Sequence, residues 1–123
     1  MKLRNNILGA GLWAIAAGAS ALSLGASRGA VVLGSSLDLT FDVQPDTGSD
    51  VASSCVAATV KSGDAQLSES KVFVTPLPET GGRTGVRVQA SVAIDEPIVQ
   101  VTLTAGCAGR VARTYIFFAD PPQ

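Results

Sequence analysis

The stretch Leu37-Asp38-Leu39-Thr40-Phe41-Asp42-Val43 decides the fold class of this 123-residue chain. Every second residue along it is apolar, and each residue between them is polar. Side chains of an extended chain point alternately to its two sides, so one side of this segment is apolar and the other polar. The alternation predicts a β-strand with one buried and one solvated face.

The same two-residue period recurs along the rest of the chain, separated by turn-forming residues. We expect about seven short strands, at residues 30–33, 37–43, 55–61, 71–75, 86–94, 98–105 and 111–119. Pro76 and Pro78 should end the fourth, because proline has no amide hydrogen to donate to a sheet. The last is apolar on both faces, which predicts a central strand. The pattern predicts an all-β fold, a small antiparallel β-sandwich with immunoglobulin-like architecture.

The N-terminus has the three parts of a secretory signal. Lys2 and Arg4 are followed by an uncharged stretch, and Ala19 and Ala21 are the small residues that a signal peptidase requires. We expect cleavage after Ala21, which gives a signal peptide at 1–21 and a periplasmic domain at 22–123. A cut near Ala26 is the alternative. The membrane would be involved only through an uncleaved signal.

Cys55 and Cys107 are the only cysteines. In an exported protein, such a pair is most simply a disulfide. It would close a loop of about 50 residues and stabilise the fold by about 4 kcal/mol on the chain-entropy model. Cys107 continues the apolar side of 98–105, so its sulfur is expected to point into the core. The spacing leaves open whether the bond crosses the core or joins neighbouring strands.

The composition argues against an enzyme and against a metal or cofactor site. The chain has no histidine, which removes the commonest general base and the commonest metal ligand. Acidic residues recur every four positions, at Asp38, Asp42, Asp46 and Asp50, but without the spacing of a calcium loop. Removal of the basic signal changes the net charge from −1 to −3, which argues against nucleic-acid binding.

Three segments, taken in order, resemble a known family. They are the Leu/Gly-rich start at 24–37, Asp95-Glu96-Pro97-Ile98-Val99-Gln100-Val101, and 113–122, which reads RTYIFFADPP. Together they resemble the N-terminal periplasmic domain of FimV-type proteins, which support type IV pilus assembly and twitching motility. The matching motif residues are Glu96, Pro97, Arg113, Tyr115, Asp120, Pro121 and Pro122. Ser36 departs from the pattern, because the family usually has proline there.

The resemblance implies a non-enzymatic interaction or scaffold domain in the bacterial periplasm. Its partners would be cell-envelope proteins, pilus assembly components among them, or peptidoglycan. Family members usually continue into further modules, so the resemblance implies a truncated or free-standing member. The alternative is a free-standing periplasmic binding or chaperone-like β-sandwich unrelated to pili.

The motif residues also have physical interpretations of their own. Pro97 is expected to set the start of a strand, because it cannot donate to a ladder. Glu96 is expected to accept a backbone hydrogen bond at the same corner. Asp120-Pro121-Pro122 is expected to direct the chain outward in an extended form.

Overall fold

The structure, a computed structural model, describes residues 22–122. These residues form eight strands and one short 3-10 helix, Glu69–Lys71. The predicted signal peptide at 1–21, with Ala19 and Ala21, lies outside the described residues. Within residues 22–122, no helix is long and apolar enough to cross a bilayer.

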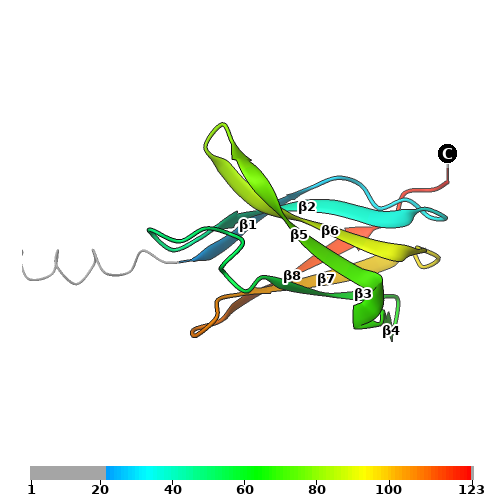
Figure 1. Cartoon of the computed structure of the whole chain (residues 1–123). Coiled ribbons are helices and arrows are strands. Elements are labelled where there is room, and N and C mark those ends of the chain that lie inside the picture. The colour runs from blue at the N-terminus through cyan, green and yellow to red at the C-terminus, as the bar shows by residue number, and fades with distance from the viewer. Residues whose placement is uncertain (1–21, 123) are drawn as a thin grey trace, which may run out of the picture.

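The strands form two antiparallel four-stranded sheets (Figure 1). The first, here called the β2 sheet, has the order β1 (Ser23–Arg28), β2 (Ser36–Gln44), β6 (Arg83–Ala93), β5 (Val72–Thr80). The second, the β7 sheet, has the order β4 (Ala65–Gln66), β3 (Ala57–Ser62), β7 (Ile98–Ala105), β8 (Val111–Phe118). The chain crosses between sheets after β2, β4 and β6. This arrangement confirms the predicted sandwich of immunoglobulin-like architecture.

The predicted apolar sides of the strands meet in the core. All four apolar residues of 37–43 are almost fully buried, and so are Val99, Val101, Leu103 and Ala105 of β7. Phe41 lies at the centre, with its ring centroid 4.7 Å from that of Tyr115 and 6.2 Å from that of Phe117. Residues from β2 and β8 therefore interlock across the two sheets, and aliphatic side chains fill the remaining space.

The prediction of a first strand at 30–33 is wrong. The first strand is Ser23–Arg28, which pairs with β2 and carries a register shift between Leu24 and Ser27. Residues 30–33 contribute one parallel bridge, between Val32 and Asp120. Strand β1 was not predicted, because Ser, Gly and Ala interrupt any alternation there and the segment adjoins the predicted apolar signal.

Two predictions about strand ends and strand order are also wrong. Strand β5 continues through Pro76 and Pro78, because it is an edge strand that pairs only with β6. An edge strand tolerates proline where the missing amide would face away from the sheet. Strand β8 is not central but is the edge of the β7 sheet. Its outward apolar residues, Ile116 and Phe118, are exposed because they lie on the outer face of the sheet.

Candidate functional site

Two of the family-motif residues tie the last strand to the first. The Tyr115 hydroxyl donates a hydrogen bond to the carbonyl of Gly25, which lies inside the register shift of β1. Arg113 Nη1 donates to the carbonyls of Leu24 and Gly25, at 3.2 Å each. Its guanidinium lies 4.7 Å from the Tyr115 ring centroid. Burial raises the pKa of Tyr115. The cluster is a structural clamp, since its donors are engaged by the backbone.

The remaining motif residues lie at the opposite end of the sandwich. The Asp120 amide donates to the carbonyl of Val31, and the Leu33 amide donates to the carbonyl of Asp120. The Ala119 amide donates to the carbonyl of Pro97. Pro121 and Pro122 follow as exposed residues. These contacts use main-chain atoms, so they fix the path of the chain at this end.

Glu96 differs from its expected role. Within the described chain its carboxylate accepts no hydrogen bond, although a backbone partner was expected. Its side chain instead occupies the space beside Gly63, where a Cβ would lie 2.9 Å from both Cγ and Cδ of Glu96. Gly63 also has a φ of 59°, in the left-handed region that favours glycine. Glu96 is therefore a packing residue of the β3–β4 turn.

The disulfide between Cys55 and Cys107 is formed, as predicted. It joins the residues just before β3 and just after β7, which are neighbouring strands of one sheet. Beside it, the Gly106 amide donates to the carbonyl of Ser54 at 2.7 Å. Both cysteines are exposed, so the expectation that Cys107 points into the core is wrong. Strand β7 ends at Ala105, and Gly106, with a φ of 107°, turns the chain away.

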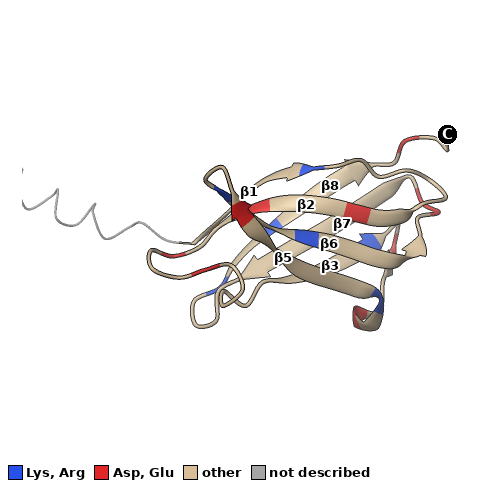
Figure 2. Cartoon of the chain, turned by 45° about the horizontal axis from the view of Figure 1, so that its top comes forward, with Lys and Arg blue, Asp and Glu red and all other residues tan. Residues whose placement is uncertain are grey.

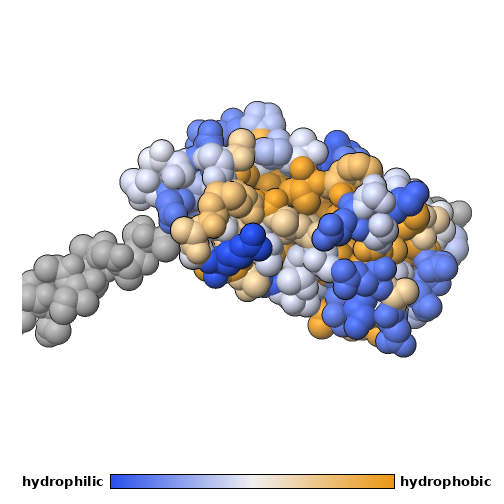
Figure 3. Space-filling view, turned by 60° about the horizontal axis from the view of Figure 1, so that its bottom comes forward, coloured by the Kyte–Doolittle hydropathy of each residue, from blue (hydrophilic) through white to orange (hydrophobic). Residues whose placement is uncertain are grey.

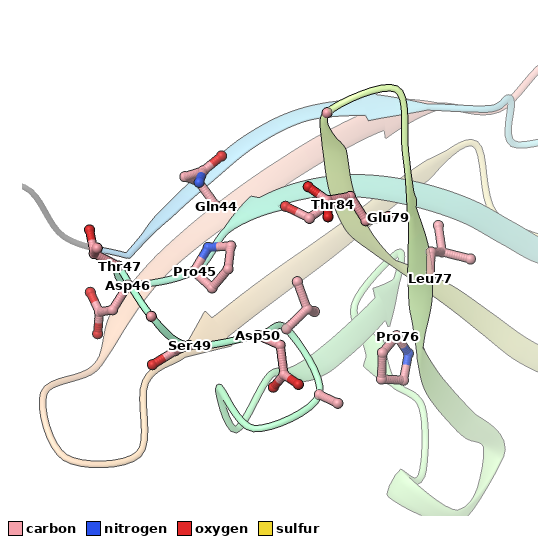
Figure 4. A pocket seen from close by; sticks show the side chains of 14 residues that line it. Gln44, Pro45, Asp46, Thr47, Ser49, Asp50, Pro76, Leu77, Glu79 and Thr84 are labelled. Atoms are coloured by element: carbon pink, nitrogen blue, oxygen red, sulfur yellow. The ribbon is translucent and has the colours of Figure 1, made fainter.

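A shallow pocket of about 540 Å³ lies at the disulfide end, between the β2–β3 loop and the β5–β6 hairpin (Figure 4). Three of its lining residues are acidic: Asp46, Asp50 and Glu79. Asp46 Oδ1 accepts the Leu22 amide, and Asp50 Oδ1 accepts the hydroxyl and amide of Ser53. The Ser53 hydroxyl and amide lower the pKa of Asp50.

Asp46 and Asp50 are therefore engaged by donors of the protein itself. Across residues 22–122, no three Asp, Glu or Cys side chains are grouped to hold a metal ion. Each of the four aspartates that recur in the sequence accepts a hydrogen bond from a different partner.

The outer face of the β2 sheet is charged and internally neutralised (Figure 2). Arg28 pairs with Asp42 and Arg87 pairs with Asp38, each with an N–O distance of 2.6 Å. The hydrogen bonds from the two guanidinium groups lower the pKa of both carboxyls. This face offers a partner little uncompensated charge and only one large exposed apolar side chain, Phe73.

The outer face of the β7 sheet is different in kind. The strand register places Ile98 opposite Phe118, Gln100 opposite Ile116 and Thr102 opposite Thr114. We call these six residues the β7–β8 face. Its apolar side chains are widely exposed, at 43% for Ile98, 57% for Ile116 and 74% for Phe118.

The polar part of this face is uncharged, and its two threonines are paired. The hydroxyls of Thr102 and Thr114 hydrogen-bond to each other at 2.9 Å. Strands β3, β4, β7 and β8 contain no Asp or Glu, and Lys61 is the one charged residue on their outward side. The apolar residues were read from the sequence as belonging to a central strand. Their exposure follows from their position on the outer face of the β7 sheet, which no further layer of the described residues covers.

A second set of apolar residues is packed against the core but only partly buried: Val56, Ala58, Leu67, Val72 and Val74. Figure 3, which looks at the molecule from below the view of Figure 1, shows apolar surface gathered across its middle and hydrophilic side chains towards both ends. The five partly buried residues form the margin of the core, whereas the β7–β8 face projects away from it.

Comparison of the chain with protein-family models, with curated proteins and with solved structures finds no significant match.

Proposed function

We propose that this chain is an exported, non-enzymatic interaction domain whose β7–β8 face binds an apolar, uncharged surface of another cell-envelope protein. The observation that carries the proposal is the contiguous exposure of Ile98, Ile116 and Phe118 on one outward sheet face. Contiguous apolar surface of this kind commonly marks a site of protein association. The face lies on two strands paired along their full eight residues, so it is presented with little need for rearrangement.

The charge pattern narrows the chemistry of the partner. Burying a charged group against this face would remove its hydration, and no carboxylate on the four strands would compensate a cation. Lys61, on β3, is the only countercharge for an anion. The matching surface is therefore expected to be apolar at its centre, with polar hydrogen-bonding groups opposite Gln100, Thr102 and Thr114.

The sheet edges argue for docking on a face rather than for exchange of a strand. Edge strand β5 contains Pro76 and Pro78, and edge strand β4 is two residues long. Both features oppose strand addition. Edge strand β8 is held to the N-terminal segment by Tyr115 and by the bridge at Asp120. A chaperone-like loan of a strand is therefore the weaker alternative.

A role in type IV pilus assembly and twitching motility is part of this proposal. It is supported by the resemblance to FimV-type N-terminal domains, in the order Glu96-Pro97, Arg113, Tyr115 and Asp120-Pro121-Pro122. Arg113, Tyr115 and Asp120 among them hold β8 and its continuation against the N-terminal segment. The competing interpretation is a free-standing periplasmic binding protein with the same face and a partner unrelated to pili.

The test uses the full chain, exported in its own host, with a photo-crosslinking amino acid at position 116. The matched control carries it at Phe73, which is 50% exposed on the opposite sheet. A crosslink from 116 to one identified envelope protein, absent from 73 and abolished by Phe118→Asp, supports the proposal. Equal crosslinking from both positions, or none from 116, overturns the assignment of the face.

The pilus role has its own test. A crosslinked partner from the pilus assembly, together with loss of twitching when the gene is deleted, supports that role, and normal twitching of the deletion strain overturns it. Crosslinking to a second copy, or binding to purified cell wall that survives Phe118→Asp, contradicts the proposed partner.

A further inference from the structure

The structure assigns a binding site for a newly formed N-terminus, namely the carboxylate of Asp46. We propose that peptide-bond hydrolysis between Ala21 and Leu22 produces an α-ammonium group that pairs with the carboxylate of Asp46. The pair then fastens the β2–β3 loop to the start of β1. This inference shares with the proposed function only the expectation of export, and it does not depend on the β7–β8 face.

The first observation is the position of Asp46. Its Oδ1 accepts a hydrogen bond from the backbone nitrogen of Leu22 at 2.7 Å. The register of the first hairpin explains the contact, because Ser23 pairs with Gln44 and the chain then turns back through Pro45 (Figure 4). Leu22 itself is only 9% exposed and belongs to the core cluster. The nitrogen is therefore held in place by burial of its own side chain.

The second observation is that, among residues 22–122, Asp46 has no cationic side chain as its partner. The ion pairs within residues 22–122 are Arg28–Asp42 and Arg87–Asp38. Two hollows flank Leu22. Asp46 is the one charged residue lining the first, and Arg113 is the one charged residue lining the second. The Arg113 guanidinium is bound by the carbonyls of Leu24 and Gly25. A carboxylate thus faces the nitrogen directly, at hydrogen-bonding distance.

The third observation separates the two candidate cleavage points. A cut after Ala26 would remove Leu22 and Leu24 from the packed interior. It would also remove Gly25, whose carbonyl accepts hydrogen bonds from Tyr115 and Arg113. A cut after Ala21 leaves all of these contacts intact, and it places small residues at both positions that a signal peptidase reads.

The hydrolysis adds one water across the Ala21–Leu22 bond. The water oxygen joins the carbonyl carbon of Ala21, the C–N bond breaks, and the products are a carboxylate on Ala21 and an ammonium group on Leu22. The reaction needs only water and a signal peptidase of the exporting cell. Before cleavage, the Leu22 nitrogen donates one neutral hydrogen bond. After cleavage, it carries a positive charge, and a charge-assisted bond is about twice as strong.

The pairing of Leu22 with Asp46 would let signal cleavage affect the β2–β3 loop, at the disulfide end of the sandwich. Asp46 opens the β2–β3 loop, which runs to Cys55 and lines the pocket of Figure 4. An ion pair at one end of the loop and the disulfide at the other fix both of its ends. The processed protein should therefore hold this loop more firmly than the precursor.

The first measurement is the intact mass of the full-length chain after export in a bacterial host. A product that begins at Leu22 is expected. A product that begins at Ser27, or one that retains its signal, overturns the inference.

The second measurement is the rate at which an amine-selective acylating reagent modifies the Leu22 amino group near pH 7. We compare the exported wild type with Asp46→Asn and with Asp64→Asn, an exposed turn residue, as the matched control. Asparagine keeps a hydrogen-bond acceptor but removes the charge, and circular dichroism verifies the fold of each variant. Pairing holds the amine in its protonated, unreactive form, so Asp46→Asn should react about threefold faster or more. Equal rates for wild type and Asp46→Asn would overturn the ion pair, and so would a similar increase in Asp64→Asn.

Discussion

The hydroxyl of Tyr115 donates a hydrogen bond to the carbonyl oxygen of Gly25, 90 residues earlier in the chain, at 2.5 Å. The bond joins the last strand of one sheet to the first strand of the other. Gly25 lies within the register shift of β1, where the pairing with β2 is interrupted. The Tyr115 ring also packs against Phe41. One side chain thus serves both the core and the contact between the terminal strands.

Replacement of Tyr115 by Phe should lower the free energy of unfolding by about 1 kcal/mol, the usual net value of one hydrogen bond. The ring and its packing against Phe41 are retained, so the change isolates the hydroxyl. Urea denaturation measures the difference, and the slope m should stay constant because the buried surface is unchanged. A variant as stable as the wild type would show that Arg113 alone satisfies the Gly25 carbonyl.

Titration of Tyr115 should show the effect of burial directly, because it is the only tyrosine in the chain. Burial raises the pKa of Tyr115 above its ordinary value of 10.0. A group with a raised pKa in the folded state contributes its full stability below its unfolded pKa and loses it as the pH rises through the folded value. The contribution of Tyr115 to stability should therefore be constant up to about pH 10 and fall above it. Ultraviolet absorbance of the tyrosinate follows the ionisation, and a midpoint at or below that of free tyrosine contradicts the prediction.

Substitution of phenylalanine by alanine should lower the free energy of unfolding much more in the core than on the surface. Phe41 is fully buried at the centre of the aromatic cluster, so Phe41→Ala should cost about 3–5 kcal/mol of stability. Phe73 is half exposed on the outer face of the β2 sheet, and Phe73→Ala should cost less than about 1 kcal/mol. Thermal or urea unfolding of the two variants provides the comparison. Similar losses would mean that Phe73 packs more closely than its exposure indicates.

Removal of the disulfide, by Cys55→Ser with Cys107→Ser, should cost about 4 kcal/mol on the chain-entropy model. The bond links residues 52 positions apart and lies on the surface. Its loss should therefore act mainly through the unfolded chain and leave the core packing unchanged. The near-ultraviolet circular dichroism of Tyr115 should persist while the urea midpoint falls. Loss of the Tyr115 signal in the folded variant would show that the bond also maintains the native packing.

The backbone at Cys55 provides an independent test. Its φ of 54° makes Cys55 the one non-glycine residue in the left-handed region within residues 22–122. In the disulfide-free protein carrying Cys107→Ser, Cys55→Gly should be more stable than Cys55→Ala by about 1 kcal/mol, because alanine strains this conformation. Urea midpoints of the two variants measure the difference. The opposite order would mean that the conformation relaxes once the bond is absent.

The core strands were predictable because alternation is a local property. The buried side chains of 37–43 and 98–105 point where the sequence placed them. Which strands lie at the sheet edges was not predictable, because an edge position depends on which strands pair with one another and not on the local sequence. Pro76 and Pro78 predicted the end of a strand. They are tolerated within β5 because β5 is an edge strand that pairs only with β6. For the same reason the apolar residues of β8 were assigned to the interior.

The features of the candidate sites also divide into those set by the local sequence and those set by strand pairing. The pairing of Cys55 with Cys107 was predictable because there are only two cysteines, but the direction of Cys107 depended on where β7 ends. The contact between Leu22 and Asp46 had no signal in the spacing of the acidic residues, since it arises from the register of the first hairpin. The β7–β8 face likewise depends on the pairing of two strands and on an outer sheet face that carries no further layer of the described residues.

Leu22 and Pro122, the first and last described residues, lie at opposite ends of the sandwich (Figure 1). Between them, Val32 and Asp120 run parallel, and Tyr115 holds Gly25. A pull on the two ends would drag these segments in opposite directions along their length. The Val32–Asp120 bridge and the Tyr115–Gly25 bond would then carry the load at the same time, instead of breaking one after the other. Force applied at Leu22 and Pro122 would therefore load these contacts in shear.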